Sequence, residues 1–134
     1  MADDLDRLRA IALALPAVNE RLSHGAPCFF VRDKRPLCYY HDEHFSDDGR
    51  RAIWCPAVPG AQEVLIAAEP ARYFRPQPSA SGVFSTWLGI HLASTARGAP
   101  RLWVDIAALL EDAYRLVAPK SLIAELDTLS AARS

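Results

Sequence analysis

The 134-residue sequence lacks the features that mark several large protein classes. It has no run of about 18 apolar residues, so we expect no membrane-spanning helix. The acidic start, MADDLDRLRA, has no basic stretch followed by an apolar one, so we expect no secretory signal. The cysteines are few, Cys28, Cys38 and Cys55, and they form no CxxC motif. Reduced thiols in a cytoplasmic protein are therefore predicted.

Motifs for nucleotide-dependent or nucleophilic catalysis are also missing. The chain has no P-loop, no GxGxxG and no GxSxG serine motif. The adjacent acid pairs, Asp47-Asp48 and Glu111-Asp112, would point in different directions from a strand or a helix, which disfavours shared acid–base chemistry. The sequence therefore favours a non-enzymatic protein, and we expect no cofactor.

The net charge is small, but the charges are unevenly distributed. The formal net charge is −1 at pH 7, whereas proteins that depend on phosphate contacts usually carry a basic surplus. Residues 70–104 contain four arginines and no acidic residue, so this segment is basic. The overall charge therefore disfavours tight nucleic-acid binding, while the segment leaves room for a local basic surface.

Hydrophobic spacing predicts helices near the two ends of the chain and one in the middle. Apolar residues recur at helical spacing over 4–15 and 102–117, and we expect Pro16 and Pro119 to end these helices. A last helix should begin at Pro119. The middle helix is predicted over 59–69, with its proline at the first helical position.

Strands are expected where short apolar and aromatic runs are bounded by turn residues. The predicted strands cover about 20–24, 27–32, 37–41, 51–57 and 83–92. The segment ARYFRPQPSASG is expected to be irregular, because it contains two prolines and a glycine. The resulting order, α-β-β-β-β-α-β-α-α, has few crossovers. It predicts a two-layer α+β fold in which an antiparallel sheet of about five strands is covered by helices.

The predicted hairpin over residues 27–41 has a charged tip, Arg32-Asp33-Lys34-Arg35, with its turn expected at Asp33-Lys34. Arginine and lysine bind phosphate oxygens, and further basic residues follow along the chain. The candidate phosphate contacts are Arg32, Lys34, Arg35, Arg50, Arg51, Arg72 and Arg75. Because Asp33 offsets part of the charge of the tip, we expect the tip to bind an anion only if Arg50, Arg51 or the arginines after residue 70 lie beside it.

A second candidate site is one face of the sheet. Gly89 would leave a bare spot beside Trp87, and this spot could form the floor of a shallow ligand pocket. The candidate pocket residues are His24, Trp54, Trp87, Gly89 and His91. Aromatic side chains dominate core burial, so the alternative that the tryptophans belong to the core stays open.

Histidines supply the remaining candidates. His41 and His44 form an HxxH pattern near Cys38, a ligand set that zinc accepts, but no second ligand pair stands at zinc-finger spacing. We therefore predict no metal site and assign the pair to a solvated loop. His24 is a candidate general base, although a role in the turn with Gly25 is favoured.

Five segments, in this order, resemble the MmcQ/YjbR family. They are LALP (13–16), HGAPCFFV (24–31), WCPAVPGAQEVL (54–65), WLGIHL (87–92) and LLEDAYRLVAPKSL (109–122). The resemblance implies a CyaY-like, secretion-chaperone-like antiparallel sheet with helices packed on it. Family members are described as DNA-binding proteins that use a double wing of hairpins.

The resemblance and the basic tip together favour a non-enzymatic cytoplasmic protein that binds DNA weakly, mainly through backbone phosphates. Steep salt dependence and little sequence preference would follow. The alternative is a small-ligand or protein-interaction domain that uses the sheet face. An enzyme built on His24, or on His41 and His44, is the third hypothesis. A formyltransferase is disfavoured, because the single asparagine, Asn19, lies in no suitable context.

Overall fold

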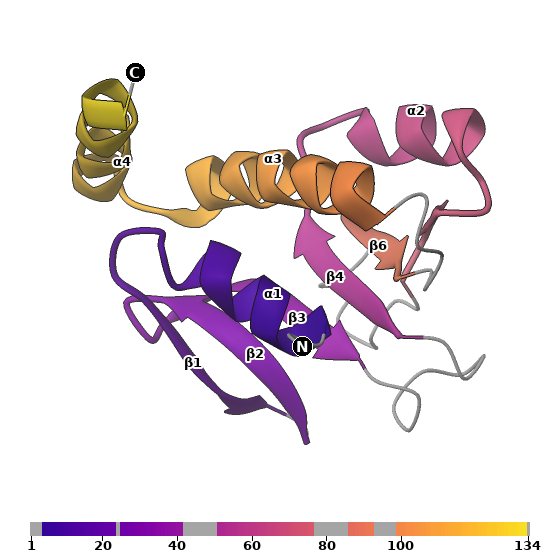
Figure 1. Cartoon of the computed structure of the whole chain (residues 1–134), viewed down its shortest axis with the longest axis horizontal. Helices are drawn as coiled ribbons and strands as arrows, with labels where there is room; N and C mark the ends of the chain where they lie inside the picture. The colour runs from indigo at the N-terminus through magenta and orange to yellow at the C-terminus, as the bar shows by residue number, and fades with distance from the viewer. Residues whose placement is uncertain (1–3, 24, 42–50, 77–85, 93–98, 134) are drawn as a thin grey trace.

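The computed structural model describes residues 4–23, 25–41, 51–76, 86–92 and 99–133 (Figure 1). In chain order the elements are α1 (Asp4–Ala12), β1 (Val18–Ser23), β2 (Ala26–Val31), β3 (Arg35–His41), β4 (Ala52–Pro56), α2 (Ala61–Ala68), β5 (Tyr73–Phe74), β6 (Trp87–His91), α3 (Ala99–Val117) and α4 (Lys120–Arg133). The strands form one antiparallel sheet in the order β1-β2-β3-β4-β6-β5. The predicted two-layer α+β fold is confirmed.

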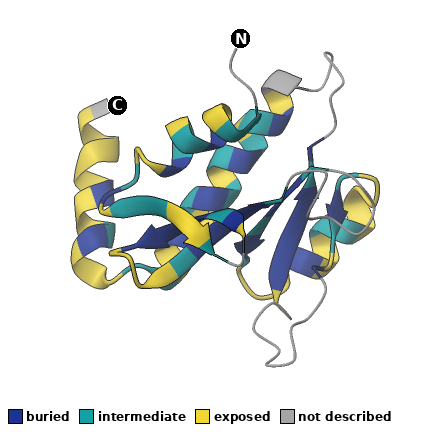
Figure 2. Cartoon of the chain, turned by 90° about the horizontal axis from the view of Figure 1, so that it is seen from below, coloured by how far each residue is buried: buried dark blue, intermediate teal, exposed yellow. Residues whose placement is uncertain are grey.

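The main core lies between the sheet and the helices. Strand side chains such as Phe29, Ile53 and Ile90 are fully buried against Ile106 and Leu110 of α3. Figure 2 shows buried residues on the strands and on the inner sides of the helices, with exposed residues on the outer sides. Side chains alternate between the two faces of a strand, so every second strand residue contributes to this core.

A β-bulge alters that alternation in β3. Phe29 pairs with Cys38 and Phe30 pairs with Pro36, so Leu37 is the extra residue between them. As a result Leu37 and Cys38, although neighbours in sequence, both join the helix-covered core. The next residue, Tyr39, belongs to a second cluster on the opposite face of the sheet.

The structure corrects several predicted boundaries. The sheet has a sixth strand, β5, in the segment that the prolines indicated to be irregular. Two residues are too few to show any periodicity, so no pattern could reveal this edge strand. The middle helix begins at Ala61 and not at Pro59, because Gly60 precedes it in a left-handed conformation with φ of 87°. Of the strand predicted over 83–92, residues 83–85 lie outside the described residues.

The predicted break at Pro119 is confirmed. α3 ends at Val117, α4 begins at Lys120, and the Pro119 carbonyl accepts hydrogen bonds from the backbone N–H groups of Leu122 and Ile123. A proline cannot donate the backbone hydrogen bond that a continuous helix requires at its position. We call residues Val117–Pro119 the α3–α4 junction. None of the helices in the described ranges is both long and apolar enough to cross a membrane.

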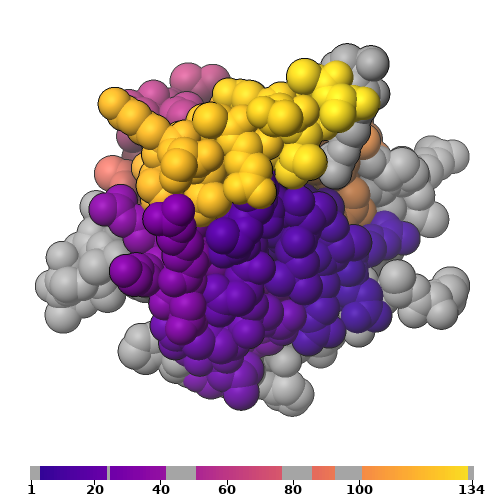
Figure 3. All heavy atoms as spheres, turned by 90° about the vertical axis from the view of Figure 1, so that its left-hand side faces the viewer, coloured from indigo at the N-terminus to yellow at the C-terminus, as the bar shows by residue number. Residues whose placement is uncertain are grey.

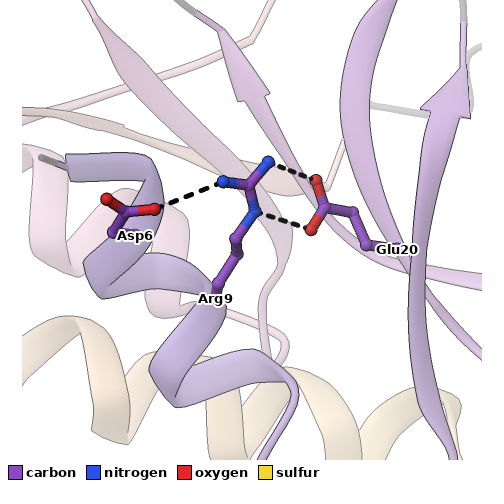
Figure 4. A network of polar contacts seen from close by, with 3 residues as sticks. All are labelled: Asp6, Arg9 and Glu20. Atoms are coloured by element: carbon purple, nitrogen blue, oxygen red, sulfur yellow. Dashed lines mark hydrogen bonds and ion pairs between the residues drawn. The ribbon is translucent and has the colours of Figure 1, made fainter.

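Two polar contacts attach the helices to the first strand and the loop before it. Figure 4 shows Arg9 of α1 donating to both carboxylate oxygens of Glu20 in β1, at 2.8 and 3.0 Å, with Asp6 also 3.3 Å from the guanidinium. The buried hydroxyl of Tyr114 in α3 donates to the backbone carbonyl of Pro16 at 2.8 Å. The first contact is partly exposed and the second is buried, so the second is more costly to break.

Replacing Tyr114 with phenylalanine should lower the free energy of unfolding by about 1–3 kcal/mol, because the buried Pro16 carbonyl would lose its donor. Urea unfolding followed by circular dichroism measures the change. Thr128→Val is the control, because Thr128 donates a solvent-exposed hydrogen bond to Ala124 within α4. Its effect should stay within about 0.5 kcal/mol. Equal effects for the two variants would contradict the anchoring role of Tyr114.

Candidate functional site

The tip of the β2–β3 hairpin contains a β-turn whose two central residues are in a left-handed conformation. The backbone N–H of Lys34 donates to the Val31 carbonyl at 3.0 Å, and Arg32 and Asp33 have φ angles of 53° and 56°. Positive φ at both central residues is the pattern of a type I′ turn, whose twist matches that of an antiparallel hairpin. The turn is therefore centred on Arg32-Asp33 and not, as predicted, on Asp33-Lys34.

Contacts with the start of β1 hold this turn in place. The Arg32 N–H donates to the Ala17 carbonyl at 2.8 Å. The Asp33 carboxylate accepts hydrogen bonds from Arg21 at 2.6 Å and from the amide of Asn19 at 3.0 Å. The hydrogen bonds from Arg21 and Asn19 lower the pKa of Asp33. The negative charge of the tip is thus paired with Arg21 on β1 and not with one of the cations of the tip.

The three cationic residues of the tip lie together on a pocket. Arg32, Lys34 and Arg35 are exposed and line a cavity of about 260 Å³ together with Val31 and the α3–α4 junction. The Arg32 guanidinium also lies 3.4 Å from the hydroxyl of Ser121, in the first turn of α4. In the described ranges, no acidic side chain forms an ion pair with any of the three cations. We call this cavity the tip pocket.

The other candidate arginines lie elsewhere. Arg51 precedes β4 at the end of β3 that is opposite the tip, and it pairs with Asp4 at 2.9 Å. Arg72 pairs with Asp105 at 3.1 Å and with Glu69, while Arg75 follows β5 at the far edge of the sheet and lies 3.9 Å from Glu63. Arg50 is outside the described residues. The structure therefore brings together three of the seven predicted contacts. The expectation that later arginines lie beside the tip is wrong for Arg51, Arg72 and Arg75.

The face of the sheet that the main core leaves uncovered carries an aromatic layer. Cys28, Phe30, Tyr39 and Trp87 are buried there, and Trp54 packs against them. The His41 ring lies 4.2 Å from the Trp54 ring, and the His91 ring stacks on Phe74 at 4.3 Å. Of the predicted ligand-pocket residues, Trp54, Trp87 and His91 belong to this layer, and His24 lies outside the described residues.

The predicted bare spot at Gly89 is wrong. A Cβ atom added at Gly89 would lie 2.4 Å from the ring of Phe74, so that ring occupies the space above the glycine. β5 places Phe74 directly opposite Gly89 in the sheet. The short edge strand that the sequence did not reveal therefore fills the floor of the predicted pocket. Glycine at this position permits the close approach of the Phe74 ring.

The thiols are unsuited to metal binding or nucleophilic chemistry. All three cysteines are free and buried, and burial raises the pKa of Cys28 and Cys55 to about 12 and that of Cys38 well above its usual value. Cys38 lies in the helix-covered core, whereas His41 contacts Trp54 on the opposite face. Within the described ranges, no group of three or more histidine, cysteine or acidic residues could hold a metal ion. His44 lies outside those ranges.

The fold is found in another protein. This chain is similar to the crystal structure of Deinococcus radiodurans protein DR2400, a DUF419-domain protein, with a TM-score of 0.64. The two share 19% sequence identity, over 87% of this chain and 80% of that chain. At this identity the likeness shows the fold alone. No family profile and no curated protein sequence matches the chain. Membership of the MmcQ/YjbR family stays a prediction.

Sequence reasoning missed the residues that shape the tip pocket. Asn19 and Arg21 were not candidates, yet both donate hydrogen bonds to the Asp33 carboxylate at the tip. The alternation of side chains along a strand places residues two apart on one face, and this was the available signal. The α3–α4 junction was predicted as a helix break but not as a pocket wall, because the junction and the tip lie far apart in the sequence.

Gly89→Ala should destabilise the fold by about 1–3 kcal/mol, because the added methyl group would overlap the Phe74 ring. Thermal unfolding measures the effect. The same substitution in a Phe74→Ala background is the matched control, and there its cost should be much smaller. If Gly89→Ala were equally costly in both backgrounds, the ring would not be what requires glycine.

The cysteines should react with a thiol reagent at pH 8 only at the rate at which the folded protein opens, because the buried thiols stay protonated. Absorbance of the released chromophore measures this rate. An added thiol at exposed Ala124 (Ala124→Cys) is the positive control and should react at once. Immediate labelling of the parent protein would contradict the burial of its thiols.

The buried thiols should also make the stability of the fold depend on pH. Since the folded pKa values of Cys28 and Cys55 are raised, the stability that these thiols support should be complete below about pH 8.5 and decline as the pH rises towards 12.

Proposed function

We propose that this protein binds nucleic acid, with DNA the first candidate, through the tip of the β2–β3 hairpin and the phosphate backbone. The observation that carries the proposal is the grouping of Arg32, Lys34 and Arg35 on one pocket, with no acidic partner among the described residues. Asp33 supports it further, because its carboxylate is paired with Arg21. Arginine forms paired hydrogen bonds with phosphate oxygens, and lysine adds a compact positive charge.

The same geometry sets the character of the binding. Three cations neutralise few phosphates, and the whole chain has a net charge of −1, so affinity should be low and should fall steeply with salt. Arg51 and Arg72 pair closely with acidic residues, and Arg75 lies at the far edge of the sheet, so we assign none of them to this surface. The buried rings of Tyr39 and Trp87 offer no open face on which bases could stack. Little sequence preference is therefore expected.

Fluorescence anisotropy with labelled duplex and single-stranded DNA at low salt tests the proposal. The logarithm of the affinity should fall with the logarithm of the salt concentration with a slope of about −2 to −3, as three phosphate contacts imply. Replacing Arg32, Lys34 and Arg35 together with alanine should abolish binding. Each single replacement should reduce the slope by about 0.7–0.9.

Arg75→Ala is the matched control, because it removes one exposed arginine at the far edge of the sheet. It should change the affinity by less than about twofold, since separated charges at a surface are screened by salt. Equal losses for Arg75→Ala and Arg35→Ala would indicate a response to net charge and not a site at the tip. Absence of binding to either form of DNA at about 10⁻⁴ M protein would overturn the proposal.

A further inference from the structure

We propose that the tip pocket binds the terminal phosphate monoester of a nucleic-acid strand. This inference rests on the proposed function, because it specifies which phosphate the three cations prefer. Figure 3 shows this side of the molecule, where α4 lies against the N-terminal strands.

The walls of the tip pocket differ in chemistry. The hairpin contributes Arg32, Lys34 and Arg35, and the α3–α4 junction contributes Val117, Ala118 and Pro119. A ligand between them would meet cations on one side and apolar groups on the other. A terminal nucleotide matches this pairing, because its phosphate needs the cations and its sugar can lie on the apolar wall.

The charge of the pocket suits a dianion better than a backbone phosphate. A phosphate diester within a strand carries one negative charge, whereas a terminal monoester carries about two near neutral pH and offers three acceptor oxygens. The tip pocket supplies three cations. Arg32 also reaches the first turn of α4, and this turn, at the positive end of the helix, contains no acidic residue. A doubly charged phosphate with three acceptor oxygens can therefore pair with more of the three cationic side chains than a backbone diester can.

Both walls are attached to the same short segment of backbone. Tyr114 of α3 donates to the Pro16 carbonyl, and Arg32 of the tip donates to the next carbonyl, that of Ala17. The spacing between the tip and the junction is therefore set by the fold before a ligand arrives. A site that is already in shape loses little conformational entropy on binding, which favours recognition of one kind of group.

Anisotropy competition with short single strands of one sequence tests the inference. The strands would carry a 5′-phosphate, a 3′-phosphate or only hydroxyl ends. A phosphorylated end should bind at least about tenfold more tightly than the hydroxyl form at pH 7.5. The advantage should shrink below about pH 6, where the monoester takes up its second proton. Arg35→Ala and Ala118→Glu, which alter opposite walls, should each remove it, and Arg75→Ala should preserve it.

The outcomes separate the inference from the proposed function. Equal affinity for all strands, reduced by the tip replacements, would overturn terminal recognition and leave backbone binding intact. Absence of binding to every strand would overturn both. Inorganic phosphate and a nucleoside monophosphate serve as further competitors. If either displaced the phosphorylated strand as well as an unlabelled copy of it does, the ligand would be a free phosphate compound and the strand-end assignment would be wrong. Circular dichroism confirms that each variant is folded.

Discussion

The arrangement of this molecule depends on a buried hydrogen bond between Tyr114 and the carbonyl of Pro16. It fixes the end of α3 against the loop that leads from α1 into β1. The adjacent carbonyl, that of Ala17, holds the hairpin turn through the N–H of Arg32. Two neighbouring peptide groups therefore set the distance between the C-terminal helices and the hairpin tip. Together with the packing of Val31 and Val117 in the main core, they give the cations and the α3–α4 junction a defined relation.

A count of the charges at the tip gives a different result from their positions in the fold. Within the four residues Arg32 to Arg35, the acid and the bases are adjacent in sequence, and a simple count gives partial cancellation. In the fold the Asp33 carboxylate binds Asn19 and Arg21 on β1, while the bases line the tip pocket with the junction. The separation arises because consecutive residues of a tight turn point in different directions. Local electrostatics can thus favour an anion on a chain whose net charge is slightly negative.

Much of the fold was predictable because it depends on local patterns. The helices and longer strands follow from hydrophobic spacing. Pro119 ends α3 because proline has no backbone N–H to continue the helix. The parts that were missed depend on contacts between distant residues. β5 is too short to show a period, and Leu37 enters the helix-covered core only because a bulge shifts the register. At the site, the basic tip was predictable, but its partners at the start of β1 and at the junction were not, because they come from other parts of the chain.

Arg32 and Asp33 of the tip have positive φ, as does Ala17, whose carbonyl binds the tip; this conformation costs a non-glycine residue about 1–2 kcal/mol. An Asn-Gly pair would form the same turn more easily. The residues at the tip therefore disfavour the backbone conformation that the turn requires, and the surrounding hydrogen bonds stabilise that conformation. Such a conflict is typical of positions where a side chain matters for more than folding. The hairpin tip is therefore a place where redesign for stability alone would remove the groups that give this surface its character.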